Sequence, residues 1–319
     1  MIALIANPSS RSGRGRRLWP LWLRELERSG RPFSMRETVS REDCEARAQE
    51  AARPGTIVTA VGGDGTINAV ITGMLRAAKE LRDTANPDGK TNPSGDAEPA
   101  RLGVLYAGTS PDFCRFHGIP IVPDQALRTL LAGKSRPVDV AAIAHRGGLE
   151  SLAFFASSCN IGLGAATAAF ANVWRARLGD TAGTGFGLMR AMLSHHPFAC
   201  ALVADGERFS FTGVNHVIVL KNPHIASGLR LGVPAEPDDG LMHLVVIHGY
   251  SRPGLLGLVR HLYSGSWAAR PGVFIRQCRE VALESTPGQA LEYDGDPRGS
   301  TPASARLLAG ALQLVCDDG

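Results

Sequence analysis

The chain has 319 residues, of which 44% are hydrophobic and 20% are charged, a composition that excludes a disordered protein. A net charge of +4 is too small to indicate a nucleic-acid partner, although it suits an anionic ligand or an anionic membrane surface. The six cysteines have no metal-binding spacing, and no apolar run reaches the ~20 residues that a membrane span requires. Neither a zinc site nor a membrane-spanning segment is expected.

Short apolar runs alternate with amphipathic stretches in the first third of the chain. Strands are predicted at 2–6, 33–39, 56–61 and 102–107, and helices at 18–28, 41–52, 67–80, 111–117 and 125–132. Ser40 is the expected N-cap of the second helix, with Asp43 in the box position. The segment 83–100 is rich in Pro, Gly, Asp and Asn, which predicts an exposed insertion. Strands that alternate with helices predict a parallel, layered α/β domain over residues 1–135.

The pattern changes near Pro137 to short apolar or alternating runs separated by turns. Strands are predicted at 138–145, 152–158, 198–204, 208–212, 214–220, 241–247, 273–277, 281–284 and 290–293, with helical stretches at 165–194 and 253–264. This pattern predicts a β-sandwich domain over 136–304. Two last strands, at 305–308 and 311–316, are expected in a C-terminal segment, 305–319, that returns to the N-terminal domain. The predicted fold class is α/β plus β.

A glycine-rich loop at the junction of a strand and a helix carries the strongest chemical signal. Its residues are Gly62, Gly63, Asp64, Gly65, Thr66, Ile67 and Asn68. Glycines allow close approach of the backbone to a ligand, and the helix that follows directs unpaired N–H groups to the same place, so a phosphate site is expected. A carboxylate inside a phosphate-binding loop indicates a metal ion, Mg²⁺, that neutralises both anions. No Walker A sequence follows the loop.

The loop is similar to the GGDGT segment shared by diacylglycerol kinases, sphingosine kinases, NAD kinases and phosphofructokinases. Four further segments resemble motifs of the diacylglycerol kinase catalytic family in their order along the chain. They are Asn7-Pro8-Ser9-Ser10 before Gly13, Gly108-Thr109-Ser110-Pro111-Asp112-Phe113-Cys114-Arg115, Asp238-Asp239-Gly240-Leu241-Met242 and Tyr293-Asp294-Gly295-Asp296. The resemblance extends over most of the chain, and several ordered motifs are more specific than any single one.

The resemblance implies a role for individual residues. Those expected at the nucleotide are Asn7, Ser9, Ser10, Thr38, Gly62, Gly63, Asp64, Gly65, Thr66, Asn68 and Thr109. Asp64 and Asp112 would hold the catalytic Mg²⁺, and Asp294 or Asp296 would take the proton from a lipid hydroxyl. A second, structural Mg²⁺ would lie at Glu236, Asp239 and the backbone of Leu241. Because Asp294 and Asp296 are two residues apart around Gly295, the sequence does not decide which of them is the base.

Two residues depart from the family pattern. Pro111 replaces an Asn that would anchor its loop through side-chain hydrogen bonds, and a proline can only stiffen the loop instead. Asp296 replaces a Glu and is one methylene shorter. Beside the N-terminal motif, Arg11, Arg14, Arg16 and Arg17 form a basic cluster. This cluster is either a solvated surface, a triphosphate contact or a patch for an anionic membrane.

The resemblance implies an ATP- and Mg²⁺-dependent kinase that phosphorylates a hydroxyl of diacylglycerol or a related lipid alcohol. The expected protein is cytoplasmic, associates peripherally with the membrane that carries its lipid substrate, and is a candidate homodimer. One alternative is an NAD kinase, although the Asn-Glu pair of that family is not found after the loop. Another is a non-catalytic regulator that binds nucleotide or lipid, which the proline at position 111 motivates.

Overall fold

The computed structural model describes the chain apart from residues 86–97, 147–152, 226–228, 265 and 318–319. Most of the exposed insertion predicted at 83–100 therefore lies outside the described residues. The chain forms two compact units, one of Met1–Val138 with Gly310–Gly319 and one of Asp139–Ala309. It passes between them along two strands, β5 (Ser135–Arg146) and β16 (Asp296–Val315).

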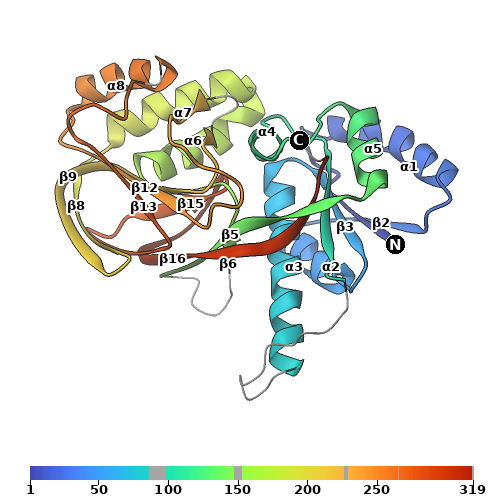
Figure 1. The fold of residues 1–319 in the computed structure, drawn as a ribbon. Helices are drawn as coiled ribbons and strands as arrows, with labels where there is room; N and C mark the ends of the chain where they lie inside the picture. The colour runs from blue at the N-terminus through green and yellow to red at the C-terminus, as the bar shows by residue number, and fades with distance from the viewer. Residues whose placement is uncertain (86–97, 147–152, 226–228, 265, 318–319) are drawn as a thin grey trace. The chain divides into compact units, whose positions relative to one another are not determined.

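The first unit is built on a parallel sheet with the order β2-β1-β3-β4 (Figure 1). The strands are β1 (Ile2–Ala6), β2 (Phe33–Glu37), β3 (Ile57–Gly62) and β4 (Arg101–Tyr106). β4 also pairs in parallel with the end of β16, where Gln313 lies opposite Arg101. β1 and β3 are buried along their whole length, as their continuous apolar runs predict for strands covered on both faces.

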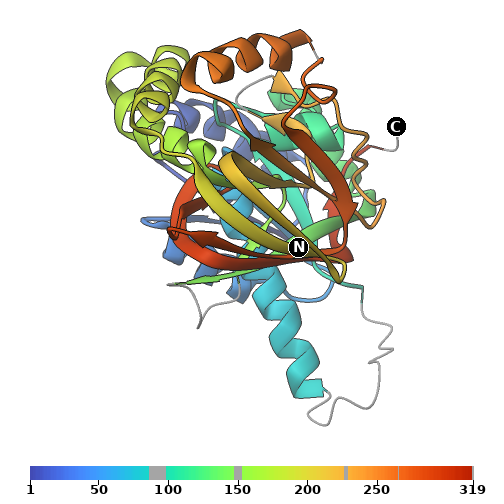
Figure 2. The ribbon, with the colours of Figure 1, turned by 90° about the vertical axis from the view of Figure 1, so that its left-hand side faces the viewer.

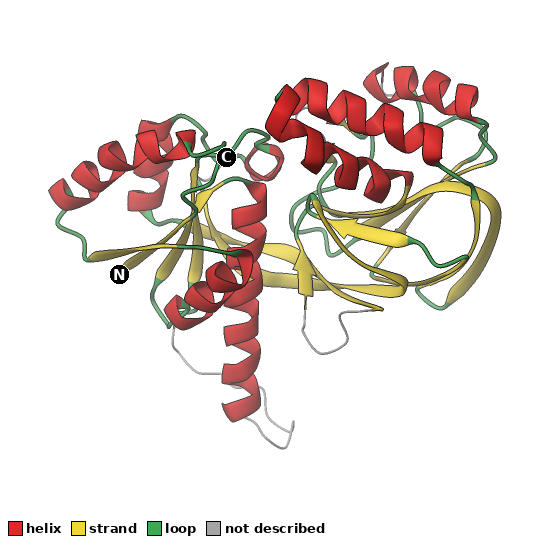
Figure 3. Cartoon of the chain, turned by 180° about the vertical axis from the view of Figure 1, so that it is seen from behind, coloured by secondary structure: helices red, strands yellow, loops and turns green. Residues whose placement is uncertain are grey.

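Helices cover both faces of this sheet (Figures 1 and 3). The helices on one face are α1 (Trp19–Arg28), which follows a 3₁₀ turn at Arg14–Leu18, and α5 (Pro123–Ala132); on the other are α2 (Arg41–Ala51) and α3 (Asp64–Ala85). A short helix, α4 (Asp112–His117), follows β4. Trp22 and Leu26 of α1 pack with Leu127 of α5 against Leu4. Side chains alternate across a strand, so Leu4 faces these helices while its neighbours face the opposite layer.

Two local predictions can be compared with the observed helix starts. Ser40 caps α2 as expected, because its hydroxyl accepts from the backbone N–H of Asp43 at 3.1 Å, and the Asp43 carboxylate accepts from Val39 N–H at 2.9 Å. The prediction that α3 starts at residue 67 was wrong. Thr66 and Ile67 already donate to the carbonyl of Gly63, so the second half of the glycine-rich loop is the first turn of the helix.

The second unit is built mainly of antiparallel strands (Figure 2). They are β6 (Ala153–Phe155), β7 (Ser158–Gly162), β8 (Phe198–Ala204), β9 (Glu207–Leu220), β12 (Met242–His248), β13 (Val273–Cys278), β14 (Glu280–Thr286) and β15 (Ala290–Tyr293), with parts of β5 and β16 and a small pair, β10 (His224–Ile225) and β11 (Leu229–Arg230). β9 pairs with β8 along its first half and with β7 and β12 along its second. One buried cluster of apolar side chains, including Phe155, Leu202 and Leu244, fills the unit.

Three strand boundaries differ from those predicted. The strand predicted at 152–158 is two strands, β6 and β7, because the chain turns at residues 156–157. The strands predicted at 208–212 and 214–220 are the single strand β9, in which Gly213 adopts φ +62° and bends the strand without ending it. The two strands predicted at the C-terminus likewise belong to one strand, β16.

The helices of this unit lie on one side of its strands (Figures 1 and 2). They are α6 (Leu163–Leu178), α7 (Asp180–Ser194) and α8 (Arg252–Ser264). The stretch predicted as helical at 165–194 is thus two helices, with a break at Gly179, which adopts φ +77°. Within the described part of the chain, no helix is both long enough and apolar enough to cross a membrane.

Candidate active site

The glycine-rich loop is held against a second loop that follows β4. A Cβ atom at Gly108 would lie 2.4 Å from the Cα of Gly63 and 2.7 Å from the Tyr106 hydroxyl. At Gly62, a Cβ would lie 2.3 Å from the hydroxyl oxygen of Thr66. Both loops lie at the carboxyl ends of neighbouring parallel strands, which is where ligands bind in open α/β sheets. Gly108 is therefore required for the contact between the two loops, and Gly62 for the close approach of Thr66 within its own loop.

This contact leads to a prediction for two matched glycines. Gly108→Ala is expected to lower the free energy of unfolding by about 2 kcal/mol, because backbone must move to admit the methyl group. Gly65→Ala is the control, because no atom lies within 4 Å of its added Cβ, and it should be neutral or slightly stabilising at the start of a helix. Thermal unfolding of the two variants measures the difference. Equal melting temperatures would contradict the proposed contact.

The predicted nucleotide residues of the N-terminal motif meet the glycine-rich loop. Asn7 donates from Nδ2 to the hydroxyl of Thr66 at 3.0 Å, and its Oδ1 accepts from the backbone N–H of Ser9 at 2.9 Å. Thr38 is buried, and its backbone N–H donates to the carbonyl of Ala6 at 2.9 Å. Ser10 is also buried. The ends of β1, β2 and β3 therefore bring these residues together at one edge of the sheet.

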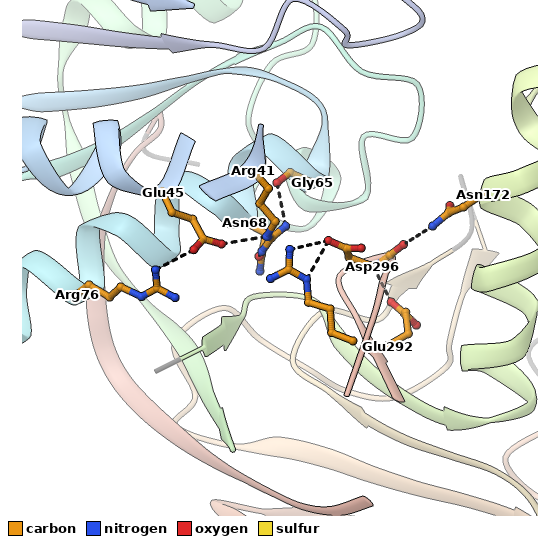
Figure 4. A network of polar contacts seen from close by, with 10 residues as sticks. Arg41, Glu45, Gly65, Asn68, Arg76, Asn172, Glu292 and Asp296 are labelled. Atoms are coloured by element: carbon orange, nitrogen blue, oxygen red, sulfur yellow. Dashed lines mark hydrogen bonds and ion pairs between the residues drawn. The ribbon is translucent and has the colours of Figure 1, made fainter. Parts of the chain in front are cut away.

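Asn68 has a structural partner that the sequence did not indicate. Its Oδ1 accepts a hydrogen bond from the guanidinium of Arg41 at the start of α2, and Arg41 also lies against the carbonyl of Gly65 at 3.5 Å (Figure 4). Arg41 pairs with the buried Glu45 at 2.9 Å, and Glu45 pairs with Arg76 of α3 at 2.8 Å. This network fixes the first turn of α3, and with it the loop, to α2.

Two acidic residues, Asp64 and Asp112, meet at the contact between the loops. The backbone N–H of Asp112 donates to Oδ2 of Asp64 at 3.2 Å. Asp112 itself accepts from the hydroxyl of Ser110 at 2.8 Å and pairs with Arg115 at 3.2 Å. Pro111 is the N-cap residue of α4 and forms no side-chain cap bond, so the loop is held by the hydrogen bond that the next residue makes with Asp64.

The two carboxylates fit the chemistry of a Mg²⁺ site. Mg²⁺ is usually held by one or two protein carboxylates, with phosphate and water oxygens completing its six positions. Asp64 and Asp112 supply such a pair beside the start of a helix of 22 residues. The described residues contain no group of three or more His, Cys, Asp or Glu side chains that could hold a metal by themselves. The phosphates of a nucleotide would therefore have to complete the coordination.

A cavity of about 510 Å³ opens beside the second loop. Its lining includes Tyr106, Gly108 and Thr109, together with three arginines of the basic cluster, Arg11, Arg14 and Arg17. The fourth arginine, Arg16, pairs with Glu37 at 2.9 Å instead. Three of the four arginines therefore lie at this cavity.

The Tyr293–Asp296 motif of the second unit forms a tight hairpin between β15 and β16. Asp294 and Gly295 are the two loop residues, with φ of +49° and +87°, and Tyr293 pairs with Asp296 across the hairpin. This geometry favours Asp followed by Gly. The carboxylate of Asp294 accepts three backbone N–H bonds, from Ala156 at 2.9 Å, Ser157 at 2.9 Å and Ser158 at 3.0 Å. It therefore holds the turn between β6 and β7.

Asp296 is in a different environment. Its carboxylate pairs with Arg298 at 2.9 Å, and its side chain retains 40% of its exposure to solvent. The same hairpin is tied to α6 by Asn172, whose amide donates to the carbonyl of Gly295 at 3.2 Å (Figure 4). Both candidate bases are partly exposed, but both oxygens of Asp294 accept backbone N–H bonds, whereas Asp296 pairs with one side chain, Arg298.

A third carboxylate of this hairpin, Glu292, was missed from the sequence. It is buried and accepts from the amide of Asn160 at 2.8 Å and from the backbone N–H of Gly295. Burial raises the pKa of Glu292 to about 7. The Oδ1 of Asn160 lies 3.1 Å from Nε2 of His216, and burial, with a smaller effect of His195, lowers the pKa of His216 to about 4. The three side chains form a polar network in which Glu292 is buried and Asn160 and His216 are partly buried.

The raised pKa of Glu292 predicts how stability depends on pH. Between its ordinary pKa of 4.5 and its folded pKa of about 7, the folded protein binds more protons than the unfolded chain, so this group's contribution to stability falls as the pH rises. Glu292→Gln should therefore stabilise the protein at pH 8 by up to about 3 kcal/mol and give little gain at pH 5. Urea unfolding at both pH values measures this, with the exposed Glu284→Gln as control. A pH-independent difference would contradict the prediction.

Comparisons with known proteins agree with this architecture. The family model of the diacylglycerol kinase catalytic domain matches residues 1–143, and the model of the YegS C-terminal NAD kinase beta sandwich-like domain matches residues 157–316. A relative from Salmonella gallinarum named "Probable lipid kinase YegS" is 31% identical over 292 residues, 90% of this chain and 87% of that protein. The chain therefore belongs to the family of YegS-like probable lipid kinases, which carry the diacylglycerol kinase catalytic domain.

Two further proteins are similar to this chain over nearly its whole length. A "Probable lipid kinase YegS-like" from Chromohalobacter salexigens is 29% identical over 301 residues, 92% of this chain and 87% of that protein. The crystal structure of a diacylglycerol kinase from Bacillus anthracis strain Sterne superimposes with a TM-score of 0.73 at 20% identity, covering 99% and 96% of the two chains. The resemblance identified from the ordered motifs is confirmed, and the protein is an enzyme of the kinase class.

One family expectation does not fit the residues of this chain. The second Mg²⁺ was predicted at Glu236, Asp239 and the backbone of Leu241, but the ammonium of Lys221 binds the Asp239 carboxylate and lies 3.1 Å from the Leu241 carbonyl. Burial raises the pKa of Asp239, but Lys221 and backbone N–H bonds lower it further, so the pKa lies below its usual value. A cation of the protein already stands beside these oxygens, so no step of the reaction is assigned to a second metal.

Proposed function

We propose that this protein is an ATP- and Mg²⁺-dependent lipid kinase that phosphorylates a hydroxyl of diacylglycerol or a related lipid alcohol. The observation that carries the proposal is the contact between Asp64 and Asp112, at the carboxyl ends of neighbouring parallel strands and at the start of α3. This arrangement combines backbone N–H groups for phosphate with carboxylates for a metal ion, as phosphoryl transfer requires. The names of the relatives support a lipid as the acceptor.

The first unit supplies the donor side of the reaction. Gly62, Gly63, Gly65 and Thr66 would surround the phosphates, and Asn7 would hold the loop in place through Thr66. Thr109 and the arginines of the cavity add polar and positively charged groups for an anionic ligand. Asp64 and Asp112 would hold Mg²⁺, which would supply positive charge to offset that of the transferred phosphoryl group.

The second unit supplies the acceptor side. Asp296 would accept the proton of the lipid hydroxyl while the hydroxyl oxygen forms its bond to the γ-phosphorus and the bond from that phosphorus to the β-phosphate bridge oxygen breaks, which releases ADP. Asp294 would act as a positioning residue, because its three backbone hydrogen bonds hold the hairpin on which Asp296 lies. Of the two candidate bases, Asp294 and Asp296, the role of proton acceptor is therefore assigned to Asp296.

The proposed protein works in the cytoplasm and reaches its substrate by peripheral association with the membrane surface. Its net charge of +4 favours a surface that contains anionic lipids. Transfer should therefore be faster when diacylglycerol is presented in vesicles that contain anionic phospholipid than in neutral vesicles, and added salt should reduce the difference.

The proposal is tested with purified full-length protein, ATP and Mg²⁺ on a panel of defined acceptors. The panel contains diacylglycerol, monoacylglycerol, a sphingoid base and a glycolipid in mixed vesicles, with NAD as the alternative acceptor. Formation of a phosphorylated lipid supports the proposal. Formation of NADP would identify an NAD kinase, and binding of nucleotide without transfer to any acceptor would identify a regulator.

A further inference from the structure

A buried lysine occupies the place at which the family would hold a second metal ion. Lys221 directly follows β9, and none of its surface is exposed. Its Nζ lies 2.8 Å from a carboxylate oxygen of Asp139 on β5 and 3.1 Å from the carbonyl of Leu241, and it is hydrogen-bonded to Oδ1 of Asp239. The three N–H groups of an ammonium thus have three oxygen acceptors, two of them charged.

The surrounding backbone is arranged around the same two carboxylates. Asp139 accepts from the N–H of Gly240 at 2.8 Å, and its own N–H donates to the carbonyl of Pro237 at 2.9 Å. Asp239 accepts from the N–H groups of Leu241 at 3.0 Å and Glu236 at 3.2 Å. The turn at 236–241 is thereby tied to β5, and Lys221 ties it to the end of β9.

This set of oxygens would suit a divalent cation if the lysine were absent. Two carboxylates and a backbone carbonyl are the ligand types that Mg²⁺ and Ca²⁺ take in proteins. The carboxylate of Asp139 is buried, whereas that of Asp239 stays partly exposed. The buried carboxylate needs a compensating cation, because an unpaired buried charge is strongly destabilising. Lys221 supplies that charge from within the chain, and its ammonium fills the space at the oxygens.

We propose that Lys221 is a permanent substitute for the structural metal ion, so that the second unit folds and remains stable without a divalent cation. The lysine joins the same two segments, the 236–241 turn and β5, that an ion at these oxygens would join. The proposal is independent of the kinase reaction, because it concerns the stability of the unit and requires no substrate.

The first test uses the native full-length chain without nucleotide. Its divalent metal content is measured by mass spectrometry after dialysis against chelator-free buffer, and its melting temperature is measured in EDTA and in millimolar Mg²⁺. The proposal predicts less than stoichiometric metal and no loss of melting temperature in EDTA. One tightly held ion per chain, or a lower melting temperature in EDTA, would overturn it.

The second test changes the lysine itself. Lys221→Ala should lower the melting temperature in EDTA by about 10 °C, because the buried carboxylate of Asp139 and its partner Asp239 lose their cation. Millimolar Mg²⁺ or Mn²⁺ should restore at least about half of that loss, since room for an ion is created and binding to the folded state stabilises it. Lys221→Met is the matched variant, because its side chain fills the space without charge, and it should not be rescued.

The change that Mg²⁺ causes in the melting temperature of the native chain is subtracted from the change in each variant, because it includes binding of the ion elsewhere in the molecule. Equal responses of Lys221→Ala and the native chain to the ions would contradict the equivalence of the lysine and a metal. If Lys221→Ala does not fold even with Mg²⁺, the metal content and the EDTA response of the native chain decide the proposal. If the native chain phosphorylates no lipid but its metal content and its EDTA response are as predicted, the proposed function is refuted and the proposal about Lys221 stands.

Discussion

Asp64→Asn is expected to reduce the rate of phosphoryl transfer by about 10³-fold, because it removes one of two carboxylates that would hold Mg²⁺ against the phosphates. The substitution keeps the oxygen that accepts from the backbone N–H of Asp112, so the contact between the loops should persist. The melting temperature is therefore expected to change little. Initial rates with saturating lipid and varied ATP and Mg²⁺ measure the effect.

The control for this prediction is Glu27→Gln, which removes an exposed carboxylate of α1 in the same unit and should leave the rate unchanged. Higher Mg²⁺ concentrations should recover part of the activity of Asp64→Asn, because the lost carboxylate acts through the ion. The activity of Glu27→Gln should respond to Mg²⁺ as the native activity does. A rate within a few-fold of the native value at all Mg²⁺ concentrations would show that Asp64 does not serve the reaction.

Asp296→Asn and Asp294→Ala are expected to fail in different ways, although the two residues are neighbours in one hairpin. Asp296→Asn should lose activity by about 10³-fold through loss of the base. It should keep its melting temperature, since a half-exposed pair with Arg298 contributes little stability. Asp294→Ala should lower the free energy of unfolding by about 4 kcal/mol, because three backbone N–H groups lose their acceptor and alanine is unfavourable at φ +49°.

A matched control separates stability from catalysis in this pair. Asp205 also has φ +49° in a hairpin turn, and its carboxylate accepts from the N–H groups of Arg279 and Glu280, both at 2.9 Å. Asp205→Ala should therefore destabilise the protein without affecting the chemistry. Rates are measured well below the melting temperature of each variant. The assignment of the base to Asp296 is contradicted if Asp294→Ala loses the larger share of kcat while Asp205→Ala and Asp296→Asn remain active.

The parts of the fold and site that could be predicted depend on residues close together in the sequence. The run from the buried strand into Gly62 and on into a helix is a local pattern, and so is the cap formed by Ser40 and Asp43. Such features need no knowledge of the tertiary packing. The pairing of Asp64 with Asp112, 48 positions apart, was implied only by the resemblance to the diacylglycerol kinase catalytic family, and the structure places the two residues in contact.

The parts that were missed depend on contacts between distant residues. Glu292 meets Asn160 across 132 positions, and His216 meets Asn160 across 56, so nothing local marked these side chains as partners. Lys221 gave one available signal, a cation directly after the apolar run 217–220, but its partners Asp139 and Asp239 come from other segments. The division of work between Asp294 and Asp296 likewise depends on backbone groups at 156–158.

The central claim, transfer of the γ-phosphate of ATP to a lipid hydroxyl, is tested most directly with labelled ATP and a total lipid extract. The full-length protein is incubated with Mg²⁺, ATP labelled in its γ-phosphate and bacterial lipids, with the Asp64→Asn variant in parallel. The proposed function predicts a labelled product that partitions into the organic phase, is formed only by the native protein and is identified by mass spectrometry as a phosphorylated lipid alcohol. Label that remains entirely in the aqueous phase, with ATP bound but no lipid product formed, would contradict it.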